Sequence, residues 1–317
     1  KRYLSCHRLL MILSLIGCSF SDLYAQTLTL TFDGVIGREG IGAGQLMNPS
    51  AVAIDPTGNL YVADAGNSRI QLFDQHGRYV RHIGGFGFNT AQFNRPQGLA
   101  ATGLDVFVAD TQNRRIQRLD RRLNFLGVLS GEPDVQDDPK NAFGFPNGIA
   151  VSGIGDIYIT DVENEEVLKM NTSGDVEIRF GGFNDGRGRL REPAGIAVDR
   201  TGLIYVADAG NDRIAVYDTF GGFMRAIDTD GLSTPKGIAI DRQDRIYIAD
   251  TGNNRIVIVS NKGDLLLAFG AKGAGIGSFL APQNIETDAD ESVYIVDTGN
   301  HRIQKFTVRE VEEEQAK

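Results

Sequence analysis

The sequence predicts an all-β protein in which six repeated units close into a ring. The main evidence is a segment that recurs six times and is clearest at Ile246–Ile256. Its aspartate returns every 42 to 51 residues, an interval typical of propeller blades and solenoid units. The six copies are Asp64, Asp110, Asp161, Asp208, Asp250 and Asp297. An aromatic residue stands three positions before each copy and a β-branched residue six positions after it. This pattern indicates two strands around a tight turn.

The composition agrees with strands joined by short turns. The chain has 317 residues, of which 41% are hydrophobic and 23% charged. One compact domain of this length buries about three quarters of its unfolded surface. There are 39 glycines and no tryptophan, and no long stretch shows the 3.6-residue period of an amphipathic helix.

The first complete unit is predicted to hold four antiparallel strands, which we name a, b, c and d in chain order. They span residues 51–55, 60–64, 69–74 and 78–84, with turns rich in Gly, Asn or Pro between them. Each unit opens on a proline, where strand a has not yet begun to pair: Pro49, Pro96, Pro146, Pro193, Pro235 and Pro282. Three residues earlier stands an apolar anchor that we expect to fill the groove between units: Leu46, Phe93, Phe143, Leu190, Leu232 and Phe279.

The ring is predicted to close through the N-terminal strand. The last unit has strands a to c at residues 283–288, 292–297 and 302–307 but no strand d, whereas Leu28–Ile36 is a strand that precedes the first unit. The glycine-rich segments after both, 37–44 and 270–277, match without a gap, so 28–36 corresponds to a strand d. Pairing it with 302–307 removes the exposed edges of an open array.

Residues 1–25 have the pattern of a signal peptide. Lys1, Arg2 and Arg8 precede an apolar run too short to span a bilayer. We therefore expect an exported protein, periplasmic or on the cell surface, with the ring at 26–308 and an acidic C-terminal tail at 309–317.

The leader offers two ways of being processed. Residues 15–18 resemble the lipobox of bacterial lipoproteins, which would make Cys18 the lipidated first residue and the membrane anchor. The alternative is ordinary cleavage after Ala25. Cys6 and Cys18 are the only cysteines, so the mature domain is expected to have neither a disulfide nor a thiolate metal site.

The repeat resembles the NHL repeat. Pro193–Asp218 contains Pro-x-Gly-Ile-Ala-Val-Asp, Ile-Tyr-Val-Ala-Asp and Asn-x-Arg-Ile in this order. The resemblance extends over about 28–307 and implies a six-bladed β-propeller. It implies no single function, because such propellers include RNA readers, protein-binding platforms, receptor sensor domains and a metal-dependent lyase.

The turn after each central aspartate provides the first candidate site. Five units place an arginine there, which gives either a ring for an anionic ligand or a framework that bridges units: Arg69, Arg115, Arg213, Arg255 and Arg302. The third unit has Glu166 instead. Repetition in nearly every unit favours the framework, because Asp and Asn side chains commonly satisfy turn backbones.

Positions that vary between units provide the second set of candidates. The tips of the turns carry different residues on one face of the ring: Ser68, Arg114, Glu165, Asp212, Asn254 and His301. Loops held by a rigid frame usually carry recognition residues. The long loop 131–145 on the same face carries four acidic residues but fits no calcium-loop pattern. In strand a, Glu286 replaces an alanine of the other units, so it either faces the channel or pairs with a neighbouring arginine.

These features favour a non-enzymatic, monomeric platform that holds a protein or glycan on its turn-tip face. The alternative is a metal-dependent lyase or lactonase with a channel site. Zinc would need converging histidines, and His76, His82 and His301 are expected too far apart. No cofactor is expected, although calcium at Glu286 stays possible. Nucleic-acid binding is disfavoured by export and by the formal charge of -9.

Overall fold

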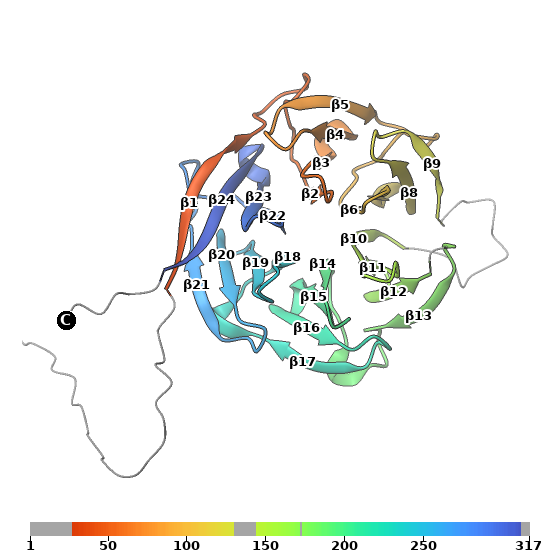
Figure 1. Ribbon diagram of the computed structural model, residues 1–317. Coiled ribbons are helices and arrows are strands. Elements are labelled where there is room, and N and C mark those ends of the chain that lie inside the picture. The colour runs from red at the N-terminus through yellow and green to blue at the C-terminus, as the bar shows by residue number, and fades with distance from the viewer. Residues whose placement is uncertain (1–26, 130–143, 172, 312–317) are drawn as a thin grey trace, which may run out of the picture.

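The structure, a computed structural model, describes residues 27–129, 144–171 and 173–311. Over these residues the chain forms six four-stranded antiparallel sheets, arranged as blades around a central axis (Figure 1). This architecture is a six-bladed β-propeller and confirms the predicted ring of six units.

The blades follow one another along the chain, and each runs from an innermost strand a to an outermost strand d. Blade 1 consists of β2 (Ala51–Ile54), β3 (Leu60–Asp64), β4 (Arg69–Phe73) and β5 (Tyr79–Gly84). Blade 2 consists of β6 (Leu99–Ala101), β7 (Asp105–Asp110), β8 (Arg115–Asp120) and β9 (Phe125–Val128). Blade 3 consists of β10 (Pro146–Val151), β11 (Ile157–Asp161), β12 (Glu166–Met170) and β13 (Val176–Phe180).

The remaining blades repeat this order until the ring closes. Blade 4 consists of β14 (Pro193–Val198), β15 (Ile204–Asp208), β16 (Arg213–Tyr217) and β17 (Phe223–Ile227). Blade 5 consists of β18 (Pro235–Ile240), β19 (Ile246–Asp250), β20 (Arg255–Val259) and β21 (Leu265–Phe269). Blade 6 consists of β22 (Pro282–Thr287), β23 (Ser292–Asp297), β24 (Arg302–Val311) and β1 (Thr27–Ile36). The N-terminal strand is therefore the outermost strand of the last blade, as predicted.

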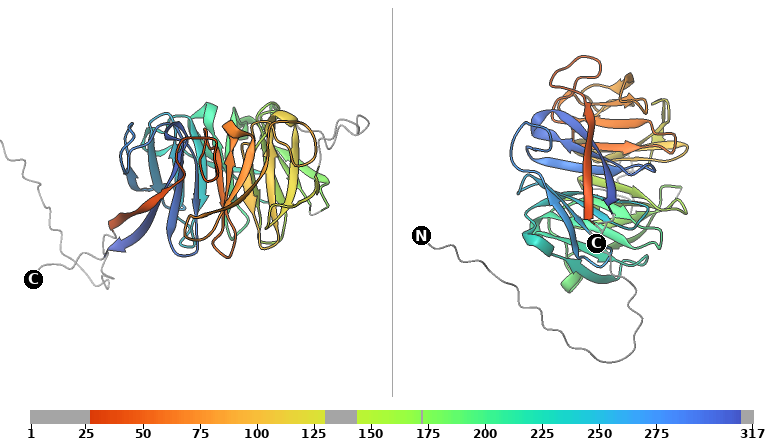
Figure 2. Two further views of the ribbon diagram at one scale, coloured as in Figure 1. Left: turned by 90° about the horizontal axis from the view of Figure 1, so that it is seen from above. Right: turned by 60° about the vertical axis from the view of Figure 1, so that its left-hand side comes forward.

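Strand β24 continues further than its sequence pattern indicated. It was expected to end at Thr307, but it pairs with β1 as far as Val311, opposite Thr27. Residues 309–311 of the expected acidic tail thus belong to a strand, because β1 provides partners for them. The two long strands extend together beyond the disc (Figure 2).

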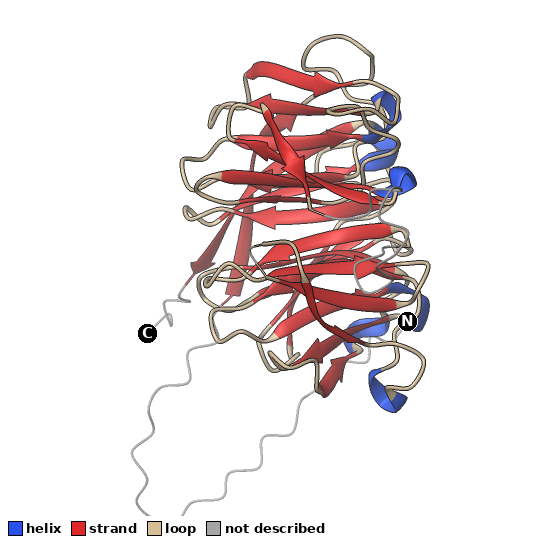
Figure 3. Cartoon of the chain, turned by 90° about the vertical axis from the view of Figure 1, so that its right-hand side faces the viewer, coloured by secondary structure: helices blue, strands red, loops and turns tan. Residues whose placement is uncertain are grey.

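Successive strands of a blade run in opposite directions, so the turns fall on two faces. We call the side with the b-to-c turns and d-to-a loops the loop face, and the side with the a-to-b and c-to-d turns the opposite face. Short 3-10 helices mark the loop face (Figure 3): η1 (Ala65–Asn67), η2 (Thr111–Asn113), η3 (Gly186–Gly188), η4 (Ala209–Asn211), η5 (Thr229–Gly231) and η6 (Thr298–Asn300). No helix in the described ranges is both long and apolar enough to cross a membrane.

The hydrophobic core is divided among the interfaces between blades. Each of the six buried clusters among the described residues joins two neighbouring blades. Leu46, for example, packs with Val52 of blade 1 and Ile303 of blade 6. The anchors Phe93, Leu190, Leu232 and Phe279 are buried in the same way, as predicted. Phe143 lies outside the described residues.

Candidate functional site

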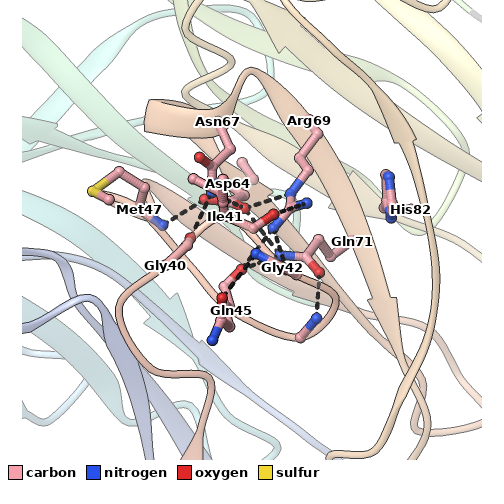
Figure 4. Close-up of polar contacts among 12 residues, drawn as sticks. Gly40, Ile41, Gly42, Gln45, Met47, Asp64, Asn67, Arg69, Gln71 and His82 are labelled. Atoms are coloured by element: carbon pink, nitrogen blue, oxygen red, sulfur yellow. Dashed lines mark hydrogen bonds and ion pairs between the residues drawn. The ribbon is translucent and has the colours of Figure 1, made fainter.

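The repeated aspartate of blade 1 is the centre of a buried hydrogen-bond network (Figure 4). Asp64 ends β3, where its carboxylate is fully buried, and its Oδ1 accepts a hydrogen bond from the backbone N of Met47 at 2.7 Å. Its Oδ2 accepts bonds from Asn67 Nδ2 at 2.8 Å, Arg69 Nε at 2.7 Å and Gln71 Nε2 at 2.9 Å. The turn, strand β4 and the preceding loop are thereby fixed to one buried charge.

The guanidinium of Arg69 has no donor directed at the channel. Its Nη1 donates to Ile41 O at 2.9 Å, and its Nη2 donates to Gly42 O at 2.7 Å and Gln45 O at 2.8 Å. The same Arg–Asp pair occurs in four more blades: Arg115–Asp110 at 2.8 Å, Arg213–Asp208 at 2.7 Å, Arg255–Asp250 at 2.7 Å and Arg302–Asp297 at 2.8 Å. These contacts correspond to the framework interpretation, in which the arginines tie each blade to the loop that enters it.

Blade 3 satisfies its aspartate in another way. Asp161 accepts backbone N–H bonds from Gly144 at 2.6 Å and Phe145 at 3.0 Å. Glu166, at the arginine position, pairs with Arg179 of strand d. Burial raises the pKa of the Glu166 carboxyl, and the nearby Arg179 opposes that shift. In blade 3 the arginine therefore stands on strand d, whereas in the other five blades it stands on strand c.

The turn-tip residues share one backbone conformation. Ser68, Arg114, Glu165, Asp212, Asn254 and His301 all have φ between 51° and 55°. This left-handed region is accessible to Asn and Asp but unfavourable for most other residues. The tip positions are therefore constrained by the turn, although their side chains differ.

Most of these side chains contact the following blade, so they are not as independent of the frame as the sequence suggested. Arg114 pairs with Glu163 at 2.7 Å and lies over the ring of Phe145, and Glu165 pairs with Arg189 at 3.3 Å. Three tips accept a backbone N–H: Asp212 from Thr234 at 2.7 Å, Asn254 from Ala281 at 2.9 Å and His301 Nδ1 from Asn48 at 3.0 Å. Sequence reasoning missed this role because the partner lies in the next repeat.

A hollow lined by arginines lies on the loop face in the segment that enters blade 4. Its volume is about 700 Å³, and its lining includes Arg187, Arg189, Arg191 and Arg213. Arg189 lies over the ring of Phe183, which is 77% exposed. The sequence analysis did not select this loop, although three arginines alternate there between residues 187 and 191.

Two of these arginines are available for a ligand. Arg213 pairs with Asp208, and Arg189 pairs with Glu165. Arg187 and Arg191 are exposed, and neither side chain makes an ion pair with any residue the structure describes. The nearby Asp185 and Asp212 already accept backbone N–H bonds. The hollow can therefore bind carboxylates or other anions.

The second candidate region is a cavity of about 340 Å³ in the channel. It is lined by the second halves of the strands a, which lead to the a-to-b turns, so it lies toward the opposite face. Glu286 lies in its wall, among Ala100, Ala150, Ala197 and Ala239. Of the two interpretations of Glu286, the structure supports the channel one. It also separates Glu286 from the turn tips, which lie on the loop face.

The Glu286 carboxylate has few partners. Its Oε1 accepts a hydrogen bond from the backbone N of Thr287 at 3.1 Å, and no cation of the described ranges lies within ion-pair distance. Burial, and secondarily the charge of Asp288, raise the pKa of Glu286 to about 7. The group therefore changes its charge near neutral pH.

The donor set around Glu286 does not fit a metal. Calcium takes six to eight oxygen ligands in proteins. The lining offers a single carboxylate and the hydroxyls of Thr102 and Ser152. In the described part of the chain no three His, Cys, Asp or Glu side chains are grouped so that they could hold a metal ion.

The three histidines of the body lie apart, as the sequence indicated. His82 Nδ1 is 2.6 Å from Tyr79 Oη on the outer strand β5, His76 lies in a c-to-d turn and His301 lies on the loop face. Cys18, the leader and residues 131–143 of the acidic loop lie outside the described residues.

Sequence comparison identifies the repeat. Residues 46–73, 190–217 and 232–259 match the model of the NHL repeat. The chain is 35% identical over 125 residues to the RING finger protein nhl-1 of Caenorhabditis elegans, covering 39% of this chain and 12% of that protein. It is 28% identical over 148 residues to the protein brain tumor of Drosophila melanogaster, covering 46% and 13%. The chain thus spans only about an eighth of the length of these relatives.

Solved structures share the fold at low sequence identity. A streptogramin B lyase superimposes with a TM-score of 0.62 and 15% identity, over 91% of this chain and all of the other. A gluconolactonase from Xanthomonas campestris gives a TM-score of 0.64 and 16% identity, over 88% and 99%. At such identities the likeness concerns the fold alone.

Proposed function

The chain carries NHL repeats in a closed six-bladed propeller, and from this we propose that it is a non-enzymatic binding module that holds a protein on its loop face. The observation that carries the proposal is the arginine-lined hollow at blade 4. Arginine and aromatic residues are enriched at protein interfaces and at the residues that contribute most to binding. Arg187 and Arg191, together with the exposed Phe183, provide this combination.

The chemistry of the hollow indicates what kind of segment it holds. Arginine binds carboxylates through two parallel hydrogen bonds, and exposed guanidinium groups without a partner leave this capacity unused. The partner should therefore present an acidic segment, with an apolar side chain placed against Phe183. The rigid β framework below the loop supports the backbone from which these side chains extend.

The test uses an acidic peptide probe, an octamer of glutamate with one leucine, in titration calorimetry at low and high salt. The double variant Arg187→Glu/Arg191→Glu should lose most of the binding, because each charge is reversed. Arg122→Glu/Arg242→Glu, which reverses two exposed arginines of the opposite face, is the matched control and should bind like the wild type. Equal binding by both variants would refute the proposed site. Binding of an acidic oligosaccharide but not of the peptide would favour a glycan.

We also propose that the module is exported and anchored through Cys18. Strand β1 runs from the opposite face toward the loop face, because Ile36 pairs with Ile303 beside the b-to-c turn and Thr27 pairs with Val311 at the other end of the ladder. An anchor ahead of β1 would therefore direct the loop face away from the membrane and toward a partner. Cys18→Ser should move the protein from the membrane fraction to the soluble fraction. An unmutated protein that is soluble and begins at Gln26 would contradict the anchor.

The enzyme alternative has less support. The lyase and lactonase likeness concerns the fold, and the channel lining holds one carboxylate rather than a set of metal ligands. A metal analysis of the purified protein tests this point. Stoichiometric zinc or calcium that survives dialysis would favour an enzyme.

A further inference from the structure

Strand β22 departs from the other inner strands at three positions, and two of the departures have structural partners. Asn284 replaces a glycine found in four blades, and its Oδ1 accepts a hydrogen bond from the backbone N of Val52 at 3.0 Å. Thr287 replaces an apolar residue, and its Oγ1 donates to Ile240 O at 3.3 Å. Glu286 replaces alanine, but it contacts only the backbone of its own neighbour. The fold therefore explains the first two changes and leaves Glu286 unexplained.

Neighbouring inner strands approach each other closely at a level nearer the loop face than Glu286. At the glycine positions the inner strands pack backbone to backbone: a Cβ on Gly98 would lie 1.9 Å from Asn147 O, and one on Gly148 would lie 2.4 Å from Ala194 O. Two residues further along each strand, the alanines leave the cavity of about 340 Å³. The cavity, which we call the cup, is lined by the second halves of the inner strands and therefore faces the a-to-b turns.

The cup is large enough for a small molecule, because such sites begin at about 300 Å³. Its lining side chains are mainly alanine, leucine, valine and isoleucine, whereas the greater part of its exposed surface is polar. Among these side chains only Glu286 can carry a charge. A carboxylate shielded from water is unfavourable unless an opposite charge accompanies it.

We propose that the channel binds a small organic ammonium ion, with its ammonium group on Glu286 and its apolar body against the alanines. One carboxylate matches one positive charge, whereas a divalent metal would need more oxygen ligands than the side chains of the wall supply. The ligand enters from the opposite face, so this site is separate from the loop-face site of the proposed function. The raised pKa of Glu286 agrees with a carboxylate that lacks its counter-charge.

A second pocket, which we call the side pocket, adjoins the cup on the side of the ring away from blade 6. Four blades close their a-to-b turn with a Tyr–Asp hydrogen bond: Tyr61–Asp55, Tyr205–Asp199, Tyr247–Asp241 and Tyr294–Asp288. Blades 2 and 3 have Thr102 and Ser152 in place of this aspartate. Between them lies a pocket of about 310 Å³ that shares Thr102, Val151 and Ser152 with the channel cavity.

This side pocket contains an unused hydrogen-bond donor. Arg118 lines it and pairs through Nη2 with Asp105 at 2.8 Å, but its buried Nε has no acceptor among the described residues. A longer amine with an acceptor at its far end could reach Arg118 of blade 2, because the pocket between blades 2 and 3 lies across the ring from blade 6 (Figure 1). The preferred ligand is then an elongated amine with an acceptor group opposite the ammonium.

The experiment compares probes of equal shape and different charge. Phenethylamine and hexylamine are titrated against the full chain by calorimetry, beside phenethyl alcohol, 1-hexanol and hexanoate. The amines should bind about tenfold or more tightly than the alcohols, as a charge-assisted bond predicts, and hexanoate should not bind. Equal affinities of amines and alcohols would overturn the proposal.

Variants then locate the charge. Glu286→Gln keeps an oxygen for the Thr287 N–H, and Glu286→Ala restores the residue of the other blades. Both should abolish the preference for amines, whereas Glu165→Gln on the loop face should retain it. Retention of the preference in Glu286→Gln would refute the site. If both variants fail to fold, carboxyl-detected NMR of the wild type decides, since phenethylamine should lower the pKa of Glu286.

Calcium provides the last arm of the test. Calcium alone should bind no more tightly to the wild type than to Glu286→Gln. Stoichiometric calcium binding that disappears in this variant would replace the ammonium site by a metal site. Loss of peptide binding at Arg187 and Arg191 would not affect any of these results.

Discussion

Ile36 lies opposite Ile303 in an antiparallel pair, so the first strand of the propeller completes the blade formed by the end of the chain. Both side chains are buried in the cluster between blades 6 and 1. The closure is thus hydrophobic as well as hydrogen-bonded. It joins the two ends of the ring without a covalent bond.

Removal of residues 28–36 should therefore open the ring. β24 would become an exposed edge, which is prone to pair with other chains. We expect a lower melting temperature and aggregation, measured by calorimetry and light scattering. A truncated chain that stays monomeric and melts like the wild type would place the closure elsewhere.

A point substitution tests the same closure without removing the strand. Phe32 packs edge-to-face on Phe306, with ring centroids 5.6 Å apart. Phe32→Ala should lower the free energy of unfolding by about 2 kcal/mol, less than the roughly 3–5 kcal/mol typical of a fully buried phenylalanine, because Phe32 is only partly buried. Thr31→Ala, at an exposed neighbour, is the control and should have little effect.

Asp64→Ala tests whether the network is framework. It would leave Arg69 buried without its counter-charge, which typically costs about 3–5 kcal/mol. Chemical denaturation measures the loss. Arg78→Ala, which removes an ion pair between the exposed Arg78 and Asp74 on a c-to-d turn, should change stability little. If both variants had the same stability, Asp64 would not be the structural centre.

The turn tips should divide into two groups. Arg114→Ala and Glu165→Ala remove exposed ion pairs, so they should change the free energy of unfolding by less than about 1 kcal/mol. Asp212→Ala and His301→Ala remove acceptors for backbone N–H groups of the next blade and should cost about 1 kcal/mol each. Thermal melts of the four variants provide the comparison. The opposite order would show that the tips do not join blades.

Glu286 should make stability depend on pH. Its folded-state pKa of about 7 exceeds the ordinary 4.5, so the folded state holds the proton more tightly than the unfolded state. The resulting stabilisation is full below the unfolded pKa and is lost as the pH rises through the folded one. Compared with Glu286→Gln, the wild type should lose on the order of 2 kcal/mol between about pH 5 and pH 8. Parallel pH profiles of the two proteins would contradict this prediction.

The fold could be predicted from the sequence because the same strand–turn–strand pattern occurs six times. A single Asp–Asn–Arg turn is weak evidence, but six copies at similar intervals fix the strand order, the interfaces and the position of Leu46 and its equivalents. The strand at 28–36, which precedes the first unit, then corresponds to the missing strand d of the last blade. The prediction was wrong about where β24 ends, because its last residues form a strand only through pairing with β1.

The sites could be predicted less well because they depend on what does not repeat. Arg187 and Arg191 stand at positions of the d-to-a loop that carry other residues in the other units, so periodicity could not reveal them. The contacts of Asp212 and His301 depend on the loop of the next blade. For Glu286 a signal was available: it stands just before the a-to-b turn, which assigns it to the opposite face.

The β1–β24 ladder also determines how the ring responds to tension. Thr27 and Val311 form one end of this ladder, and the chain continues from both at the same end. A force that separates these two residues acts along the hydrogen bonds and breaks the rungs one after another, as in a zipper. A force between Thr27 and Ile303 would instead load the rungs together in shear. Pulling on the two ends of the propeller would therefore load the seam between β1 and β24 first, and loss of this ladder would open the ring into an arc.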